Sequence, residues 1–147
     1  MKDEGWRSMS ERRRRPHESL EVYQLAHALA LRVHRLTLKL PRYEMYEEGT
    51  QARRSSKSIS SQIVEGHALR CYKAEYLHYL WRSYASTEET AEHLAYLLET
   101  GSAKPQETEC TDLLEQYSVL CRKLFNYIDS VEKHHDPARP SDSANNA

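Results

Sequence analysis

Apolar side chains recur along most of this chain at alternating steps of three and four residues, which is the spacing of one face of an α-helix. Residues 19–40 carry the first such stripe, which consists of Val22, Ala26, Leu29, Val33, Leu36 and Leu40. Residues 44–68 carry a second stripe of mostly smaller side chains, namely Ala52, Ser56, Ile59, Ile63 and Gly66. The pattern therefore predicts two long helices, and the small side chains let a neighbouring helix approach the second one closely.

Two further helices are predicted in the second half of the chain. Residues 72–100 carry two adjacent stripes, Leu77, Leu80, Tyr84, Thr87, Ala91, Leu94 and Leu98 beside Tyr76, Tyr79, Ser83, Ser86, Thr90, His93 and Leu97. Residues 105–135 carry one stripe, made of Cys110, Leu113, Tyr117, Leu120, Leu124, Tyr127 and Val131. Gly101 and Pro105 mark the boundary, because glycine favours a helix end and proline a first turn. The double stripe exceeds what packing within one monomer needs, so it predicts a subunit interface.

Long helices joined by segments of a few residues favour antiparallel neighbours. The sequence therefore predicts an all-α fold, an antiparallel up-down-up-down four-helix bundle that spans residues 19–135. Residues 1–18 are expected to form a basic flexible tail, and residues 136–147 a second, polar tail.

Composition agrees with this class of fold. The chain has 147 residues with only four glycines and five prolines, so one helical domain with its own core is expected. The N-terminus has no apolar signal core, and no apolar run approaches the roughly 20 residues that span a bilayer. The three cysteines are not closely spaced. We therefore expect reduced thiols in a cytoplasmic protein with no membrane contact.

The formal net charge of −1 hides a strong asymmetry. Residues 50–82 contain six basic and two acidic side chains, whereas residues 83–120 contain eight acidic side chains and one lysine. Basic groups neutralise phosphates, and the interleaved tyrosines can stack on unpaired bases. The candidate nucleic-acid-binding residues are Arg53, Arg54, Lys57, Arg70 and Lys73. The alternative is a solvated face with core tyrosines, and the run Arg12–Arg15 is either an RNA-binding arm or an unselective solvated tail.

The stretch from Gln51 to Gly66 resembles the signature of a bacterial four-helix bundle family that includes proteins encoded in 23S ribosomal RNA intervening sequences. That signature reads Gln, a basic pair, small residues, Ser-Ile and then Asn-Ile-Ala-Glu-Gly; here Gln62 and Val64 replace the usual Asn and Ala. The matching motif residues are Gln51, Ser58, Ile59, Ile63, Glu65 and Gly66, with Ser86 and Glu89 fitting the Ser-x-x-Glu of the third helix. The resemblance covers about residues 19–130.

The resemblance implies a four-helix bundle and a homo-oligomer, since members of the family look like ring-shaped pentamers. It implies no catalytic activity, because none is established for the family. Members are linked genetically to ribosomal RNA insertions, and related bundles bind protein and RNA as accessory proteins of reverse transcriptases.

A few residues have positions or spacings that bear on possible chemical sites. A carboxylate near a helix C-terminus is unfavourable, so Glu65 is expected to have a partner in Arg54, Arg70 or a hydroxyl of the next helix. Such a partner would make a functional pocket or a buried polar network. His67 and Cys71 have ligand-like spacing without a second pair, so neither a metal nor a cofactor is expected. No nucleophile arrangement or phosphate loop is present, and we expect no enzyme activity.

The sequence thus predicts a non-catalytic, oligomeric bundle that associates with RNA or a ribonucleoprotein through the second and third helices. The alternative is a scaffold that binds a protein partner through its acidic half and does not touch nucleic acid. Salt dependence separates the two, because phosphate binding weakens steeply with salt and a hydrophobic interface does not.

Overall fold

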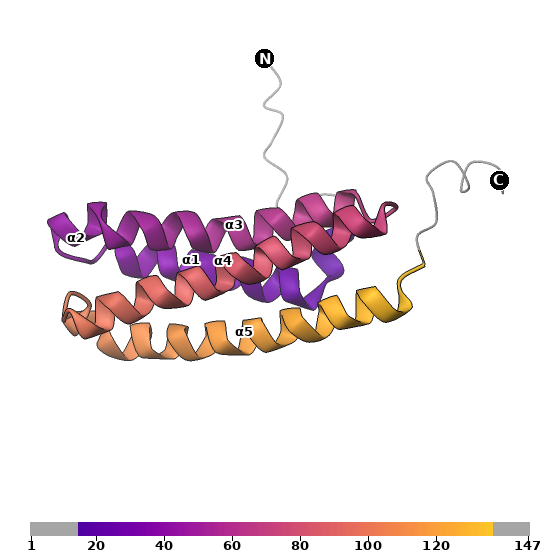
Figure 1. Ribbon diagram of the computed structural model, residues 1–147. Helices are drawn as coiled ribbons and strands as arrows, with labels where there is room; N and C mark the ends of the chain where they lie inside the picture. Colours follow the sequence, from indigo (N-terminus) through magenta and orange to yellow (C-terminus); the bar gives the residue numbers. More distant parts are fainter. Residues whose placement is uncertain (1–14, 137–147) are drawn as a thin grey trace, which may run out of the picture.

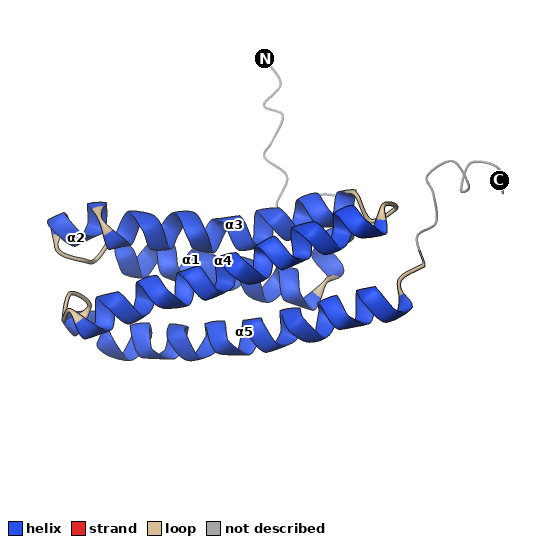
Figure 2. Cartoon of the chain, viewed as in Figure 1, coloured by secondary structure: helices blue, strands red, loops and turns tan. Residues whose placement is uncertain are grey.

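The computed structural model describes residues 15–136, and these are helical with no strand among them (Figures 1 and 2). The elements are η1 (Pro16–Ser19), α1 (Glu21–Thr37), α2 (Arg42–Tyr46), α3 (Glu48–Ala68), α4 (Lys73–Glu99), η2 (Lys104–Gln106) and α5 (Glu107–His134). The predicted all-α class is confirmed. Most of the two predicted tails, with Arg12–Arg14, lies outside the described residues. His17 within η1 is buried, so the folded part begins before residue 19.

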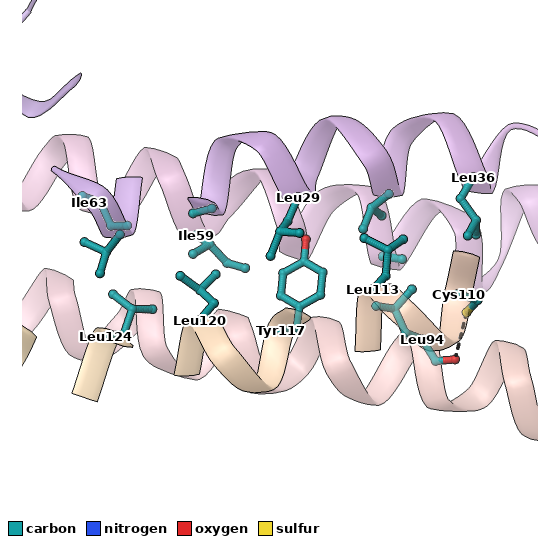
Figure 3. Close-up of a cluster of buried hydrophobic side chains, with 14 of the residues drawn as sticks. Leu29, Leu36, Ile59, Ile63, Leu94, Cys110, Leu113, Tyr117, Leu120 and Leu124 are labelled. Carbon is teal, nitrogen blue, oxygen red and sulfur yellow. Dashed lines mark hydrogen bonds between the residues drawn. The ribbon is translucent and has the colours of Figure 1, made fainter. Parts of the chain in front are cut away.

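The four long helices pack side by side around one apolar core. Helix α3 lies between α1 and α4, and α5 closes the arrangement by contacting both α4 and α1 (Figure 1). The predicted stripes supply this core, and Figure 3 shows Ile59 and Ile63 of α3 facing Leu120 and Leu124 of α5. Each buried leucine or isoleucine contributes roughly 1.5–3 kcal/mol relative to an exposed one.

The double stripe of α4 is used largely inside the chain. One stripe includes Ser83, Ser86 and Thr90, which are buried and hydrogen-bonded within α4 or to α3. The other includes Leu80 and Leu94, which are fully buried in the common core. The pattern is thus explained by packing inside the chain, because a central helix of a bundle needs two faces for two neighbours, and the subunit interface stays a prediction.

The helix predicted for residues 44–68 is two helices, and this part of the prediction is wrong. The chain breaks at Glu47, whose φ and ψ are −96° and −97°. A Cβ at Gly49 would lie 3.0 Å from the Glu44 carbonyl oxygen and 3.2 Å from a guanidinium nitrogen of Arg53. This crowding explains the glycine, and beyond the corner α2 packs against α3. Gly101 adopts a φ of 77° past the end of α4, as its predicted capping role requires.

Candidate nucleic-acid interface

Arg53 is turned toward the protein. One of its terminal nitrogens, Nη1, donates to the Thr37 hydroxyl at 3.0 Å, and the other donates to the Met45 carbonyl at 2.9 Å and to Thr50 Oγ1 at 3.2 Å. The guanidinium thus ties the end of α1, the end of α2 and the first turns of α3 together. This geometry gives Arg53 a structural role, and its contact with nucleic acid stays a prediction.

Arg54 and Lys57 face solvent from the same part of α3. Arg54 is exposed and forms no hydrogen bond or salt bridge within residues 15–136. Lys57 is also exposed, and its Nζ lies 3.1 Å from Nδ1 of His34 on α1. A neutral histidine accepts this hydrogen bond without cancelling the charge of the lysine. The pair therefore presents two uncompensated positive charges one helical turn apart.

Arg70 lies in the turn between α3 and α4, at the other end of α3, and Lys73 is the first residue of α4. Arg70 is exposed and donates to the His67 carbonyl at 2.9 Å, while Lys73 donates to the Glu132 carbonyl of α5 at 2.7 Å. Neither forms a salt bridge with a carboxylate of the described residues. Arg70 is thirteen positions after Lys57, which corresponds to roughly 20 Å along a helix. The predicted basic face therefore consists of two patches: an α3 patch of Arg54 and Lys57, and a turn patch of Arg70 and Lys73.

The interleaved tyrosines have different environments. Tyr72 is 62% exposed between Arg70 and Lys73, whereas Tyr76 is 1% exposed and its hydroxyl meets that of Tyr127. Tyr79 is half-buried beside Gly66. Only Tyr72 of the three therefore offers its ring to a base, as a stacking role requires.

The resembling motif mostly holds α3 against α4. Ile59, Ile63 and Gly66 are buried, and Ser86 donates to Gln62 Oε1 at 3.1 Å. Ser83 donates to the Ile59 carbonyl at 2.9 Å. Three other motif residues lie nearer the surface of the contact between α3 and α4. Ser58 donates to the Ser55 carbonyl, Glu89 Oε1 lies 3.4 Å from His93 Nε2, and Gln51 is exposed. The motif is thus explained by close helix packing.

Comparison with known proteins now identifies the family. Residues 18–126 match the sequence profile described as 23S rRNA-intervening sequence protein. The chain belongs to this family. No curated protein matches it significantly. The matched span runs from η1 into the last third of α5, so it contains both basic patches, and the predicted resemblance is confirmed.

In this 23S rRNA-intervening sequence family member, Glu65 has no partner. Its side chain is exposed and forms no hydrogen bond or ion pair within residues 15–136, so the predicted pairing with Arg54, Arg70 or a hydroxyl is wrong. The physical reason is solvent screening, since an exposed charge feels little of the helix dipole. The α3 end is instead closed by the backbone, with the Leu69 N–H donating to the Glu65 and Gly66 carbonyls.

A cluster of aromatic and titratable groups lies at the turn patch, and the sequence pattern does not predict it. His67 lies edge-on to Tyr76, with 6.1 Å between ring centroids, and His135 lies 5.3 Å from the same ring. His135 Nε2 is also 2.9 Å from the Arg70 carbonyl. His135 is far from His67 and Tyr76 in sequence, so no local pattern indicates that the three rings meet.

This cluster makes the stability of the family member depend on pH. Burial, followed by the charges of Arg70, His17 and His135, lowers the pKa of His67 to about 4. In the unfolded chain the pKa of His67 is about 6.5, so between about pH 4 and pH 6.5 His67 is protonated in the unfolded chain and neutral in the folded one. The free energy of unfolding is therefore expected to fall as the pH drops from about 6.5 to about 4. Below about pH 4, His67 should cause no further decrease.

Urea unfolding at pH 7 and pH 5 measures this effect. His67→Gln removes the contribution, so its two midpoints should lie closer together than those of the wild-type chain. The exposed His78→Gln is the matched control and should keep the wild-type difference. An unchanged pH dependence in His67→Gln would contradict the assignment.

The described cysteines are poor nucleophiles where they are buried. Burial raises the pKa of Cys110 to about 11, and burial with the neighbouring Glu88 raises that of Cys121 to about 12. All three cysteines are free thiols. Within residues 15–136, no three His, Cys, Asp or Glu side chains are placed to hold a metal ion. No helix in this part of the chain has the length and apolarity to cross a membrane.

Proposed function

We propose that this family member is a non-catalytic, oligomeric cytoplasmic protein that associates with RNA or a ribonucleoprotein through the α3 patch and the turn patch. One observation carries the proposal. Of the six basic side chains between residues 50 and 82, none forms a salt bridge with a carboxylate in residues 15–136, although acidic residues are abundant on α4 and α5. The charges of the residues in the two patches are therefore available to phosphates, whereas Arg53 is engaged inside the protein.

The physical case rests on counterion release. Each phosphate that a lysine or arginine neutralises frees a condensed cation, so affinity arises without a deep pocket. Two patches roughly 20 Å apart suit a structured RNA, whose phosphates are spread over a wide surface. The exposed ring of Tyr72, between two cations, adds a place for an unpaired base.

Two features support self-association. Trp81 and Phe125 are 43% and 52% exposed, and their ring centroids lie 6.2 Å apart on neighbouring helices. Residues 20–68, which include α1 and α3, carry seven basic and five acidic side chains. Residues 73–134, which include α4 and α5, carry six basic and eleven acidic side chains. Oppositely charged surfaces favour a head-to-tail contact between subunits. Such a contact gives a ring when the rotation between subunits closes, and the pentamer implied by the resemblance is of this type. A ring would also repeat the basic patches and raise avidity.

The antiparallel up-down-up-down order of the bundle is part of the proposal. Hydrogen bonds between α3 and α4 support it. Glu48, Ser55 and Ile59 follow one another along α3, and their partners His93, Thr90 and Ser83 follow in the reverse order along α4, as antiparallel helices require. The pairs between α1 and α5 follow the same rule, with Glu21 beside Lys123 and Arg32 beside Glu109.

A protein-interaction scaffold is the second candidate. A cluster of two exposed rings, Trp81 and Phe125, with the half-buried Tyr84 on the acidic helices favours it, since such rings are common at the centre of protein interfaces. In that case the protein binds a protein partner there and leaves nucleic acid unbound.

Binding of a structured RNA across a salt series tests the proposal. The affinity of the wild-type chain should fall steeply with salt, and Arg54→Ala/Lys57→Ala/Arg70→Ala should weaken binding and reduce the slope by about 2–3. Arg122→Ala, an exposed arginine on α5, is the matched control. No binding at low salt, or equal binding by the triple variant, would contradict the proposal. A monomeric mass in solution at micromolar concentration would remove its oligomeric part.

A further inference from the structure

Two tyrosine rings project into solvent from α2, at the end of the bundle opposite the turn patch (Figure 1). Tyr43 and Tyr46 are each 64% exposed, the highest value among the large apolar and aromatic side chains of residues 15–136. Neither side chain forms a hydrogen bond or a ring contact with the described residues. Tyr46 is three positions after Tyr43, so both rings lie on the same side of the helix. The short helix α2 thus presents a pair of aromatic rings to solvent.

The two residues between these tyrosines hold α2 against the rest of the protein. Glu44 is buried, and its carboxylate accepts hydrogen bonds from the Ser102 hydroxyl and, at 3.3 Å, from the Glu48 N–H. The Met45 carbonyl accepts a hydrogen bond from Arg53 of α3 at 2.9 Å. The backbone that carries the rings is therefore fixed before anything binds, which lowers the entropy lost on binding.

The exposed charge around α2 is mostly positive. Among residues 38–57, four exposed side chains are basic and one is acidic, namely Lys39, Arg42, Arg54 and Lys57 against Glu47. None of the four basic side chains forms a salt bridge within residues 15–136. Lys57 is four positions after Arg53, whose guanidinium bonds Met45, so α2 and Lys57 lie on the same side of α3. The tyrosine pair is therefore within reach of an anionic chain that binds the α3 patch.

Basic side chains beside exposed aromatic rings bind unpaired nucleotides, because the cations neutralise phosphates while bases stack on the rings. Bases inside a duplex are stacked on one another and do not offer their faces in this way. We infer that α2 and the α3 patch together bind an unpaired stretch of RNA, with bases stacked on Tyr43 and Tyr46. The inference rests on the proposed RNA function and names the part of the RNA that binds here, which is a loop, a bulge or a single-stranded end.

Affinities of the full chain for a hairpin RNA with an unpaired loop, and for a blunt duplex with as many phosphates, test the inference. The wild-type chain should prefer the hairpin. Tyr43→Ala/Tyr46→Ala should weaken hairpin binding about tenfold and leave duplex binding unchanged. Tyr43→Phe/Tyr46→Phe keeps both rings and should bind the hairpin like the wild-type chain. Tyr96→Ala, which removes an exposed tyrosine from α4, is the matched control and should also bind normally.

Two further measurements identify the cause of a change in binding. Both tyrosines are exposed, so the double variants should unfold at the urea concentration of the wild-type chain. The double variants lose no charge, so the salt dependence of their affinity should have the wild-type slope, whereas the variant of Arg54, Lys57 and Arg70 has a reduced slope.

The same experiment separates failure of this inference from failure of the proposed function. Equal wild-type affinity for hairpin and duplex, or wild-type hairpin affinity in the double alanine variant, would overturn the inference and leave RNA binding through the patches in place. Binding of neither RNA at low salt would overturn both. Phosphatidylserine vesicles are the second probe. Their binding by the wild-type chain and not by the double alanine variant, without a preference for the hairpin, would assign α2 to a membrane surface and overturn the inference.

Discussion

Replacing Arg53 with alanine is expected to lower the free energy of unfolding by about 2 kcal/mol. The half-buried guanidinium donates three hydrogen bonds, to Thr37, Met45 and Thr50, and so joins α1, α2 and α3 at one corner. Truncation leaves the Met45 carbonyl without this donor in a partly buried place, where lost bonds to a charged group are costly. Urea denaturation of the purified variant measures the change.

The neighbouring residue is the control. Arg54→Ala removes an exposed side chain without a partner, so the free energy of unfolding should stay within about 0.5 kcal/mol of the wild-type value. RNA affinity should show the reverse order among variants that remain folded, with Arg54→Ala the weaker binder. Equal stability losses at the two positions would mean that Arg53 does not hold the corner.

The second large effect is expected at Gly66. A Cβ there would lie 2.8 Å from the Cβ of Tyr79 and 3.3 Å from Cδ2 of Tyr76. The Tyr79 Cβ is attached directly to the α4 backbone, so relief requires α3 and α4 to move apart. Overpacking of this kind costs about 1–3 kcal/mol, and the helix propensity of alanine returns less than about 1 kcal/mol. We therefore expect Gly66→Ala to be destabilised by about 1–2 kcal/mol in thermal or urea unfolding.

Ser61→Ala on the exposed side of α3 is the matched substitution. It should be neutral or slightly stabilising, since alanine is the better helix former and nothing packs against it. Gly66→Ala with wild-type stability would show that the two helices are not in close contact at this point.

The long helices and their core could be predicted because burial imposes a period that the sequence records directly. Ile59, Ile63, Leu120 and Leu124 are all core residues, as the stripes predicted. The break at Glu47 carries no such signal. It follows from how tightly the chain turns between α1 and α3, and a polar segment with one glycine is compatible with a helix or a corner.

The candidate site was less predictable for a related reason. Sequence identifies a side chain as basic, but whether it faces solvent depends on its neighbours in space. Arg53 and Arg54 are adjacent and chemically alike, yet only Arg53 meets acceptors that come from other helices.

The central claim is that RNA meets the protein at the α3 patch and the turn patch. Ultraviolet crosslinking of the full chain to a bound structured RNA, followed by mass spectrometry of the linked peptides, tests it most directly. The account predicts links at Tyr72 and in peptides that contain Arg54 to Lys57 or Arg70 to Lys73. Links confined to the acidic surface of α4 and α5, or none from a complex that binds at low salt, would contradict it.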